Sequence, residues 1–316
     1  MVIRDKQSLR RCVKQAVRRA MVVETMLRFD PAIGPLGADA AMAAMAPHAG
    51  QGAPFSPDAA AVYAALDALD LPVYDLTRAQ EETEGYEREA YLREVLDAMR
   101  ARRVLVRVPQ DRAGEAAFAD ERLCPLLTVN GESAFVPGRF GIPYEQAARA
   151  AADAARVCGA QDVLAENVSF EALRYALLPL CEDEGLRLHV GLHGAGEVQA
   201  FAQLMEQFPR VRALVWADEG GELPLIGAAA KCPRILVRLC DVANLGAALA
   251  QLGSRFVAFA ACAAQPELAL GRWLCFRERL HPLLTEAYLP LARSGYELKS
   301  EQVEADVRSL LGECLG

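Results

Sequence analysis

The sequence has no long apolar run and no excess of positive charge. Behind its basic N-terminal segment, no apolar stretch reaches the roughly 20 residues that a membrane-spanning helix needs, and the segment lacks the layout of a secretory signal peptide. Acidic side chains outnumber basic ones by 42 to 34, a formal net charge of -8, which argues against nonspecific nucleic-acid binding. We therefore expect a cytoplasmic protein that binds neither membranes nor nucleic acid.

The chain also lacks the spacings that mark disulfide frameworks, zinc knuckles and several enzyme classes. Its nine cysteines form no C-x-x-C pair and lie mostly within apolar runs, which favours buried, reduced thiols. No G-x-G-x-x-G, P-loop, G-x-S-x-G or H-E-x-x-H motif occurs. No sequence motif therefore supports a function as a nucleotide-binding protein, a serine hydrolase or a zincin.

Apolar segments alternate with helix-forming ones along most of the chain. With 316 residues, 53% of them hydrophobic, the chain has room for a barrel of about 250 residues and its decorations. Eight short apolar segments read as buried strands: 21–27, 103–108, 123–129, 162–166, 186–192, 211–216, 234–240 and 256–262. Helical stretches fall between the later strands, at 145–158, 169–184, 195–208, 221–231 and 243–252. This order predicts an α/β fold, a (β/α)8 TIM barrel.

The remaining segments are read as additions to one domain that spans residues 1–316. Residues 5–20 have the apolar spacing of an amphipathic helix, and 266–293 and 299–313 are expected to be C-terminal helices. A stretch rich in glycine and proline at 31–58 predicts a long loop, and 58–102 is mostly helical in pattern. Together they form an insertion at about 31–102. Residues 72–76 are a competing strand, and 108–123 are weakly helical.

The first predicted strand carries the most informative pattern, Glu24-Thr25-Met26-Leu27-Arg28 followed by Pro31. It resembles the "acidic residue, x, His, x, His" signature of uronate isomerases in the amidohydrolase superfamily. Met26 and Arg28 stand where that signature has its two histidines. A guanidinium has no lone pair to offer, so Arg28 cannot replace an imidazole as a metal ligand.

The last quarter of the chain resembles the same family most strongly. Its short blocks occur in the family's order: Phe208-Pro209, Phe256 to Trp273, Leu284 to Leu289, Ser294 to Leu298, and Val303 to Val307. Weaker similarity covers Leu9 to Pro31, Tyr86 to Arg103, and His189-Val190-Gly191.

The resemblance implies a distorted amidohydrolase-like barrel with its site at the carboxyl ends of the strands. A divalent metal would assist aldose-to-ketose isomerisation of a sugar acid, together with a base and a cation for the substrate carboxylate. In the eighth strand the family's His-Ser-Asp-Ala-Arg-like run falls on Ala260 to Ala264, so that Cys262 takes the place of the metal-binding aspartate. Met26, Arg28 and Cys262 are thus degenerate metal positions, and we expect no metal and no other cofactor.

Several polar residues follow the predicted strands and are candidates for a site. His189, with Glu166 or Asp218, could act as acid and base, although a core histidine and helix-capping carboxylates are the structural alternatives. Substrate-binding candidates are Arg28, His193, Asn167 and Asp241. Cys262 could be a nucleophile beside His189, but its alanine neighbours favour an inert thiol.

Three functions follow as hypotheses. The first is a divergent, metal-independent barrel that binds a sugar acid or small carboxylate. The second is a metal-independent isomerase or lyase that uses His189 with Glu166 or Asp218. The third is a noncatalytic subunit that forms homo-oligomers or joins an active paralogue, with the Ala- and Met-rich segment 38–46 as its interface.

Overall fold

The computed structural model describes most of the chain, with defined gaps. The described ranges are residues 3, 5–27, 57–73, 75, 78–79, 81–82, 87–118, 120–131, 144–218, 220–240, 242–263, 265–294 and 296–315, with residues 26, 27, 57, 58 and 88 described by their backbone alone. Arg28, Asp241, the segment 38–46 and all but the end of the predicted loop at 31–58 lie outside these ranges.

The strands form one sheet in which the spatial order follows the chain order from β1 to β8. Successive pairs from β3 to β8 are parallel. The strands are β1 (Val22–Leu27), β2 (Ala101–Pro109), β3 (Leu123–Asn130), β4 (Asp162–Glu166), β5 (Arg187–Leu192), β6 (Arg212–Ala217), β7 (Ile235–Arg238) and β8 (Phe256–Val257). This order, with helices between the strands, confirms the predicted α/β fold of a distorted (β/α)8 barrel.

The eighth strand is much shorter than predicted. Residues 256–257 are in the ladder, whereas the expectation was 256–262. Two features downstream oppose a strand. The backbone of Cys262 has φ 51°, in the left-handed region that strands do not use. The Ala261 N–H donates to the side-chain carboxylate of Glu24 and not to a backbone carbonyl of the sheet. The competing strand at 72–76 was also wrong for its described residues, because 72, 73 and 75 belong to no strand.

The chain divides into two compact units. Unit 1 comprises residues 1–104, 119–123 and 260–316, and unit 2 comprises 105–118 and 124–259. That the whole chain behaves as one domain stays a prediction.

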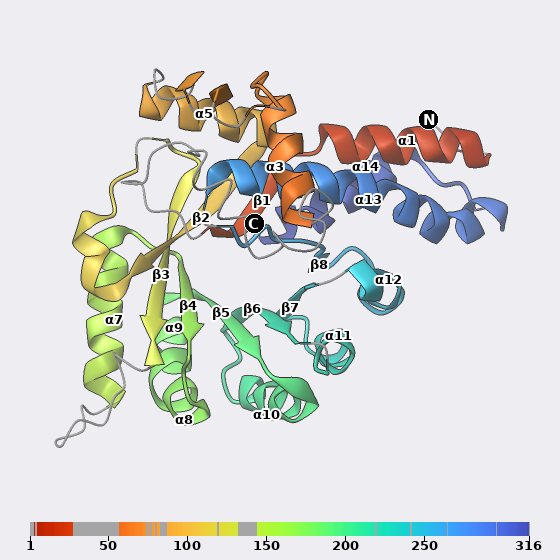
Figure 1. Ribbon diagram of the computed structural model, residues 1–316. Coiled ribbons are helices and arrows are strands. Elements are labelled where there is room, and N and C mark those ends of the chain that lie inside the picture. The colour runs from red at the N-terminus through yellow and green to blue at the C-terminus, as the bar shows by residue number, and fades with distance from the viewer. Residues whose placement is uncertain are drawn as a thin grey trace. The chain divides into compact units, whose positions relative to one another are not determined.

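Unit 1 is organised around a long helix, α13 (Pro266–Arg293). The helices α1 (Lys6–Arg19), α3 (Pro57–Ala68) and α5 (Arg88–Met99) pack against it, and α14 (Ser300–Leu310) packs on α1. Figure 1 shows α1 alongside α13. The approach of α3 is close, because a Cβ on Gly271 would lie 1.7 Å from the Ala61 carbonyl oxygen. A short 3-10 helix, η6 (Glu313–Leu315), ends the unit.

Unit 2 contains the parallel strands that follow β2 and the helices that connect them. These helices are η3 (Gln110–Glu115), α7 (Tyr144–Cys158), α8 (Phe170–Ala172), the π-helical turn η4 (Leu173–Leu177), α9 (Leu178–Glu184), α10 (Gly194–Glu206), α11 (Glu222–Lys231), η5 (Val242–Asn244) and α12 (Leu245–Leu252). In Figure 1 they follow the strands along one side of this part of the sheet. On the sheet, Leu105, Leu126 and Leu164 form a buried cluster with Cys124 and Trp216 packed against it. Because successive side chains of a strand alternate between its two faces, residues two positions from these leucines lie on the same face of the sheet.

The helices were predicted closely, since α13 matches its expected range and most others begin or end within two residues of theirs. The weakly helical stretch at 108–123 contains η3 alone. Within the described ranges, every helix falls short of the length or the apolar character that crossing a bilayer requires.

Candidate functional site

An ion pair lies at the carboxyl ends of β2 and β4 in unit 2. The Nη2 atom of Arg107 is 2.5 Å from Oε2 of Glu166, and the two side chains are 13% and 34% exposed. Both residues lie on the same face as the leucine cluster, because Arg107 is two residues after Leu105 and Glu166 two after Leu164. Each side chain therefore keeps hydrogen-bonding atoms close to solvent at the strand ends, where barrel enzymes bind their substrates.

A stacked arginine and tryptophan lie on β6 and β7. The guanidinium carbon of the buried Arg238 is 4.0 Å from the ring centroid of Trp216, which is a cation–π contact. The indole lies across the neighbouring strand β5, where a Cβ on Gly191 would be 2.7 Å from Trp216 Nε1. Glycine at position 191 thus provides the space that the indole uses.

His189 occupies a different position, in the buried part of β5. Its Nε2 atom lies 2.9 Å from Oδ1 of Asp162, the first residue of β4, and Arg187 Nη1 lies 3.5 Å from the same oxygen. Burial lowers the pKa of His189, and the hydrogen bond with Asp162 opposes that shift. The imidazole is fully buried. None of its hydrogen bonds or ion pairs in the described part of the chain involves Glu166 or Asp218.

Asp218 and His193 are brought together at the ends of β6 and β5. Asp218 accepts the Gly194 N–H at 2.8 Å, and its other oxygen lies 3.2 Å from His193 Nδ1. The Gly194 hydrogen bond is the main cause that lowers the pKa of Asp218. The His193 side chain is 82% exposed and that of Asp218 is 50% exposed. These two candidates therefore share a solvated turn between neighbouring strands.

Asn167 follows β4 with φ 51° and is exposed. Its carbonyl oxygen would be 2.0 Å from a Cβ on Gly131, so this turn depends on glycine at the end of β3. Glu166, Asn167 and Asp218 thus all lie at strand ends, as predicted from the sequence.

The acidic residue of the first-strand pattern has partners within unit 1. Glu24 is buried, and its Oε2 atom accepts the Ala261 N–H and the Trp273 Nε1–H, each at 2.8 Å. Cys262 is exposed, and Arg272 donates to the backbone carbonyls of Ala261 and Cys262. The side chain of Met26 lies outside the described atoms, as does Arg28.

Among the described residues, no group of three His, Cys, Asp or Glu side chains is placed to hold a metal ion. Sequence reasoning did not single out Arg107, Arg238 or Trp216 for function. All three residues lie near the carboxyl ends of predicted strands, and the alternation along each strand assigns each side chain to one face of the sheet. These two properties are the sequence signal that could have identified them.

Comparisons with known proteins place this geometry in a structural context. No family model and no curated protein sequence matches the chain. A uronate isomerase from Bacillus halodurans has a similar structure, with a TM-score of 0.83 and 15% identity, over 99% of this chain and 96% of that one. A "putative metal-dependent hydrolase" from Lactobacillus casei is also similar, with a TM-score of 0.61 and 11% identity over 96% of each chain. The chain therefore has a fold similar to that of the uronate isomerase.

Proposed function

We propose that this protein binds a sugar acid or a related small carboxylate at the carboxyl ends of its strands, without the metal-dependent aldose–ketose isomerisation that the family resemblance of its sequence implies. The site proposed for the ligand is the Arg107–Glu166 pair. The fold alone would equally suit a metal-dependent isomerase, and the side chains at the strand ends distinguish the two functions.

The observation that carries the proposal is the environment of Glu24. In the signature that the first strand resembles, an acidic residue precedes two histidines, and here Met26 and Arg28 stand at the histidine positions. The Glu24 carboxylate is itself buried and accepts hydrogen bonds from Ala261 and Trp273. The residues at the metal positions of the signature do not fit a divalent metal, because the Arg28 guanidinium has no lone pair to offer and a single thiol at Cys262 cannot hold an ion alone. Glu24 is thereby assigned a structural role.

The chemistry of the Arg107–Glu166 pair suits a hydroxylated carboxylate. A guanidinium has five N–H donors, and the ion pair with Glu166 occupies the Nη2 side of the fork, so a ligand carboxylate can be bound by the others. Glu166 accepts hydrogen bonds and can therefore receive them from ligand hydroxyl groups. One cation and one acceptor side by side distinguish a sugar acid from a neutral sugar and from a simple anion.

Calorimetric titration with glucuronate, galacturonate and glucose tests the proposal. We expect both uronates to bind and glucose, which lacks the carboxylate, to bind at least about tenfold more weakly, since a hydrogen bond to a charged group contributes about 1.5–3 kcal/mol. Arg107→Gln should weaken uronate binding by a similar factor. Arg112→Gln removes an exposed arginine of unit 2 that pairs with Glu115 and should leave binding unchanged.

Elemental analysis of the purified protein tests the other half of the proposal. Stoichiometric manganese, zinc or iron, or uronate isomerisation that depends on added metal, would show that a metal site persists. Failure of both uronates to bind would refute the ligand class instead. The acid–base alternative requires His189 to reach a substrate. The burial of its imidazole against Asp162 therefore favours the binding proposal.

A further inference from the structure

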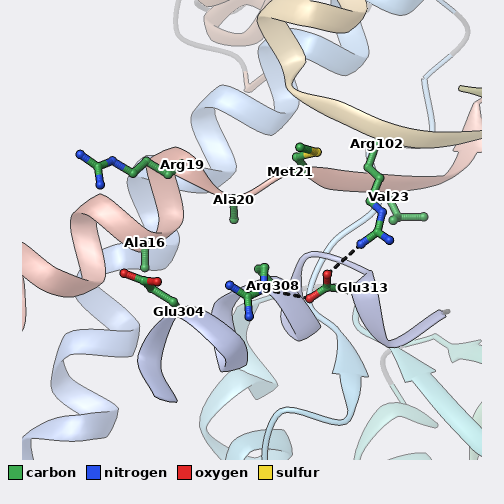
Figure 2. Close-up of a pocket in the computed structure, with 9 residues that line it drawn as sticks. All are labelled: Ala16, Arg19, Ala20, Met21, Val23, Arg102, Glu304, Arg308 and Glu313. Atoms are coloured by element: carbon green, nitrogen blue, oxygen red, sulfur yellow. Dashed lines mark hydrogen bonds and ion pairs between the residues drawn. The ribbon is translucent and has the colours of Figure 1, made fainter. Parts of the chain in front are cut away.

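Unit 1 contains a pocket of about 300 Å³ at the amino-terminal ends of β1 and β2 (Figure 2). These are the strand ends opposite to the carboxyl end of β2 that carries Arg107. The pocket lies among α1, α14 and η6, and its lining comprises Ala16, Arg19, Ala20, Met21, Val23, Arg102, Glu304, Arg308 and Glu313. Neither the fold nor the proposed function uses it.

The floor of the pocket is apolar. Ala16, Ala20 and Val23 are buried, and Met21 keeps 59% of its surface exposed although it is a large apolar residue. The last turn of α1 and the start of β1 provide these side chains. An apolar floor of this kind favours the hydrocarbon part of a ligand over a polyhydroxylated one.

The rim of the pocket is charged, with three arginines and two glutamates and thus an excess of one positive charge. Glu313 bridges two of the arginines, since its Oε1 lies 2.7 Å from Arg102 Nη1 and its Oε2 lies 3.0 Å from Arg308 Nε. Figure 2 shows this carboxylate between the two guanidinium groups, with Arg19 across the pocket from Arg102. The pocket therefore already holds one carboxylate, supplied by the chain itself.

We propose that this pocket binds a small organic monocarboxylate with an apolar body. The ligand carboxylate takes the place of Glu313 on Arg102 and Arg308, and its hydrocarbon part covers Met21 and Val23. The exchange is inexpensive because the Arg102, Arg308 and Glu313 side chains are 55%, 48% and 42% exposed, and ion pairs in such positions contribute little to stability. The volume accommodates on the order of ten non-hydrogen atoms, taking about 30 Å³ for each water-sized group.

Octanoate is a suitable probe, with octanamide as its neutral analogue and acetate as a carboxylate without the apolar body. By calorimetric titration of the full chain, we expect octanoate to bind at least about tenfold more tightly than either, because each analogue lacks one of the two contacts. Equal binding of octanamide would show that the pocket binds apolar groups without recognising the carboxylate. Equal binding of acetate would show that it binds the carboxylate without recognising the apolar body. Either result overturns the proposal.

Two matched variants separate the exchange from general electrostatics. Glu313→Gln removes the resident carboxylate and should tighten octanoate binding about threefold to tenfold, in line with the strength of exposed ion pairs. Glu304→Gln removes the same charge from the same rim, from a residue outside the Arg102 and Arg308 ion pairs, and should change the affinity less than twofold. Equal effects of the two variants would overturn the exchange.

Met21→Glu places a negative charge on the exposed part of the floor and should abolish octanoate binding, whereas Arg156→Gln, an exposed arginine of unit 2, should not affect it. Thermal unfolding confirms that each variant is folded. Glucuronate should not compete with octanoate. An unmodified protein that binds glucuronate but not octanoate would refute this site and leave the proposed function standing. Competition between the two ligands would show that they share one site and would overturn the assignment of a separate pocket.

Discussion

Replacing Glu24 by glutamine tests whether this buried carboxylate holds unit 1 together. The hydrogen bonds that it accepts from Ala261 and Trp273 have a charged acceptor, and such bonds contribute about 1.5–3 kcal/mol against about 0.5–1.5 for neutral ones. Neutralising the acceptor therefore costs about 2 kcal/mol, of which part is recovered because a buried charge is removed. We expect Glu24→Gln to lower the free energy of unfolding by about 1–2 kcal/mol.

The assay is calorimetric thermal unfolding. For folding units of roughly 150–250 residues, a loss of 1 kcal/mol lowers Tm by roughly 2–4 °C, so Glu24→Gln should lower it by roughly 2–8 °C. Glu286→Gln is the matched control, because this glutamate of unit 1 forms an exposed pair with Lys6 and should change stability by less than about 0.5 kcal/mol. Trp273→Phe removes one donor, and its effect should be smaller in the Glu24→Gln background than alone.

Two outcomes would refute this reasoning. If Glu24→Gln is as stable as the parent protein, the carboxylate does not organise the contact with Ala261 and Trp273. If the variant instead loses a metal ion that the parent protein carries, Glu24 is a ligand and the proposal of a lost metal site fails.

Three further predictions concern packing and pH. Gly191→Ala brings a Cβ to 2.7 Å from Trp216 Nε1 and should cost about 1–3 kcal/mol, with a shift in tryptophan emission; unchanged stability and emission would contradict the close contact. Gly271→Ala brings a Cβ to 1.7 Å from the Ala61 carbonyl oxygen, which belongs to the backbone and cannot rotate away, so α3 must move and urea unfolding should show a loss of at least about 3 kcal/mol. His189 has a pKa lowered by burial, so its contribution to stability is complete above the unfolded-state pKa of about 6.5 and is lost as the pH falls through the lower folded-state value, at up to about 1.4 kcal/mol per pH unit. Equilibrium unfolding at pH values from neutral downward should therefore show a steeper loss than in His189→Gln, and equal slopes would refute the burial argument.

The sequence predicted the fold better than the site. Strands such as β4 were found at their true bounds because parallel strands covered on both faces are continuously apolar, a local property. β8 was overextended because Ala258 to Cys262 continues the apolar pattern, whereas its backbone turns away at Cys262. Local pattern carries no information on that turn.

Site contacts depended on partners far apart in the chain. Trp273 donates a hydrogen bond to Glu24, which is 249 positions away in the sequence. His189 is hydrogen-bonded to Asp162, which lies on a different strand. Strand ends could be located from the sequence, so Glu166 and Asp218 were found as candidates. Which of them would meet Arg107 or His193 required the register between strands, which short apolar segments leave undetermined.

Arg277 of α13 connects the C-terminal part of unit 1 to helices near the N-terminus, which are synthesised much earlier. Its guanidinium donates to the backbone carbonyls of Arg18, Ala20 and Met99, at the ends of α1 and α5, and its burial lowers its pKa to about 10. During synthesis, α1 and α5 emerge from the ribosome long before this residue does, and both segments of unit 2, residues 105–118 and 124–259, are synthesised in between. The hydrogen bonds between Arg277 and the ends of α1 and α5 can therefore form only near the end of translation. All residues of unit 2 have been synthesised before that point.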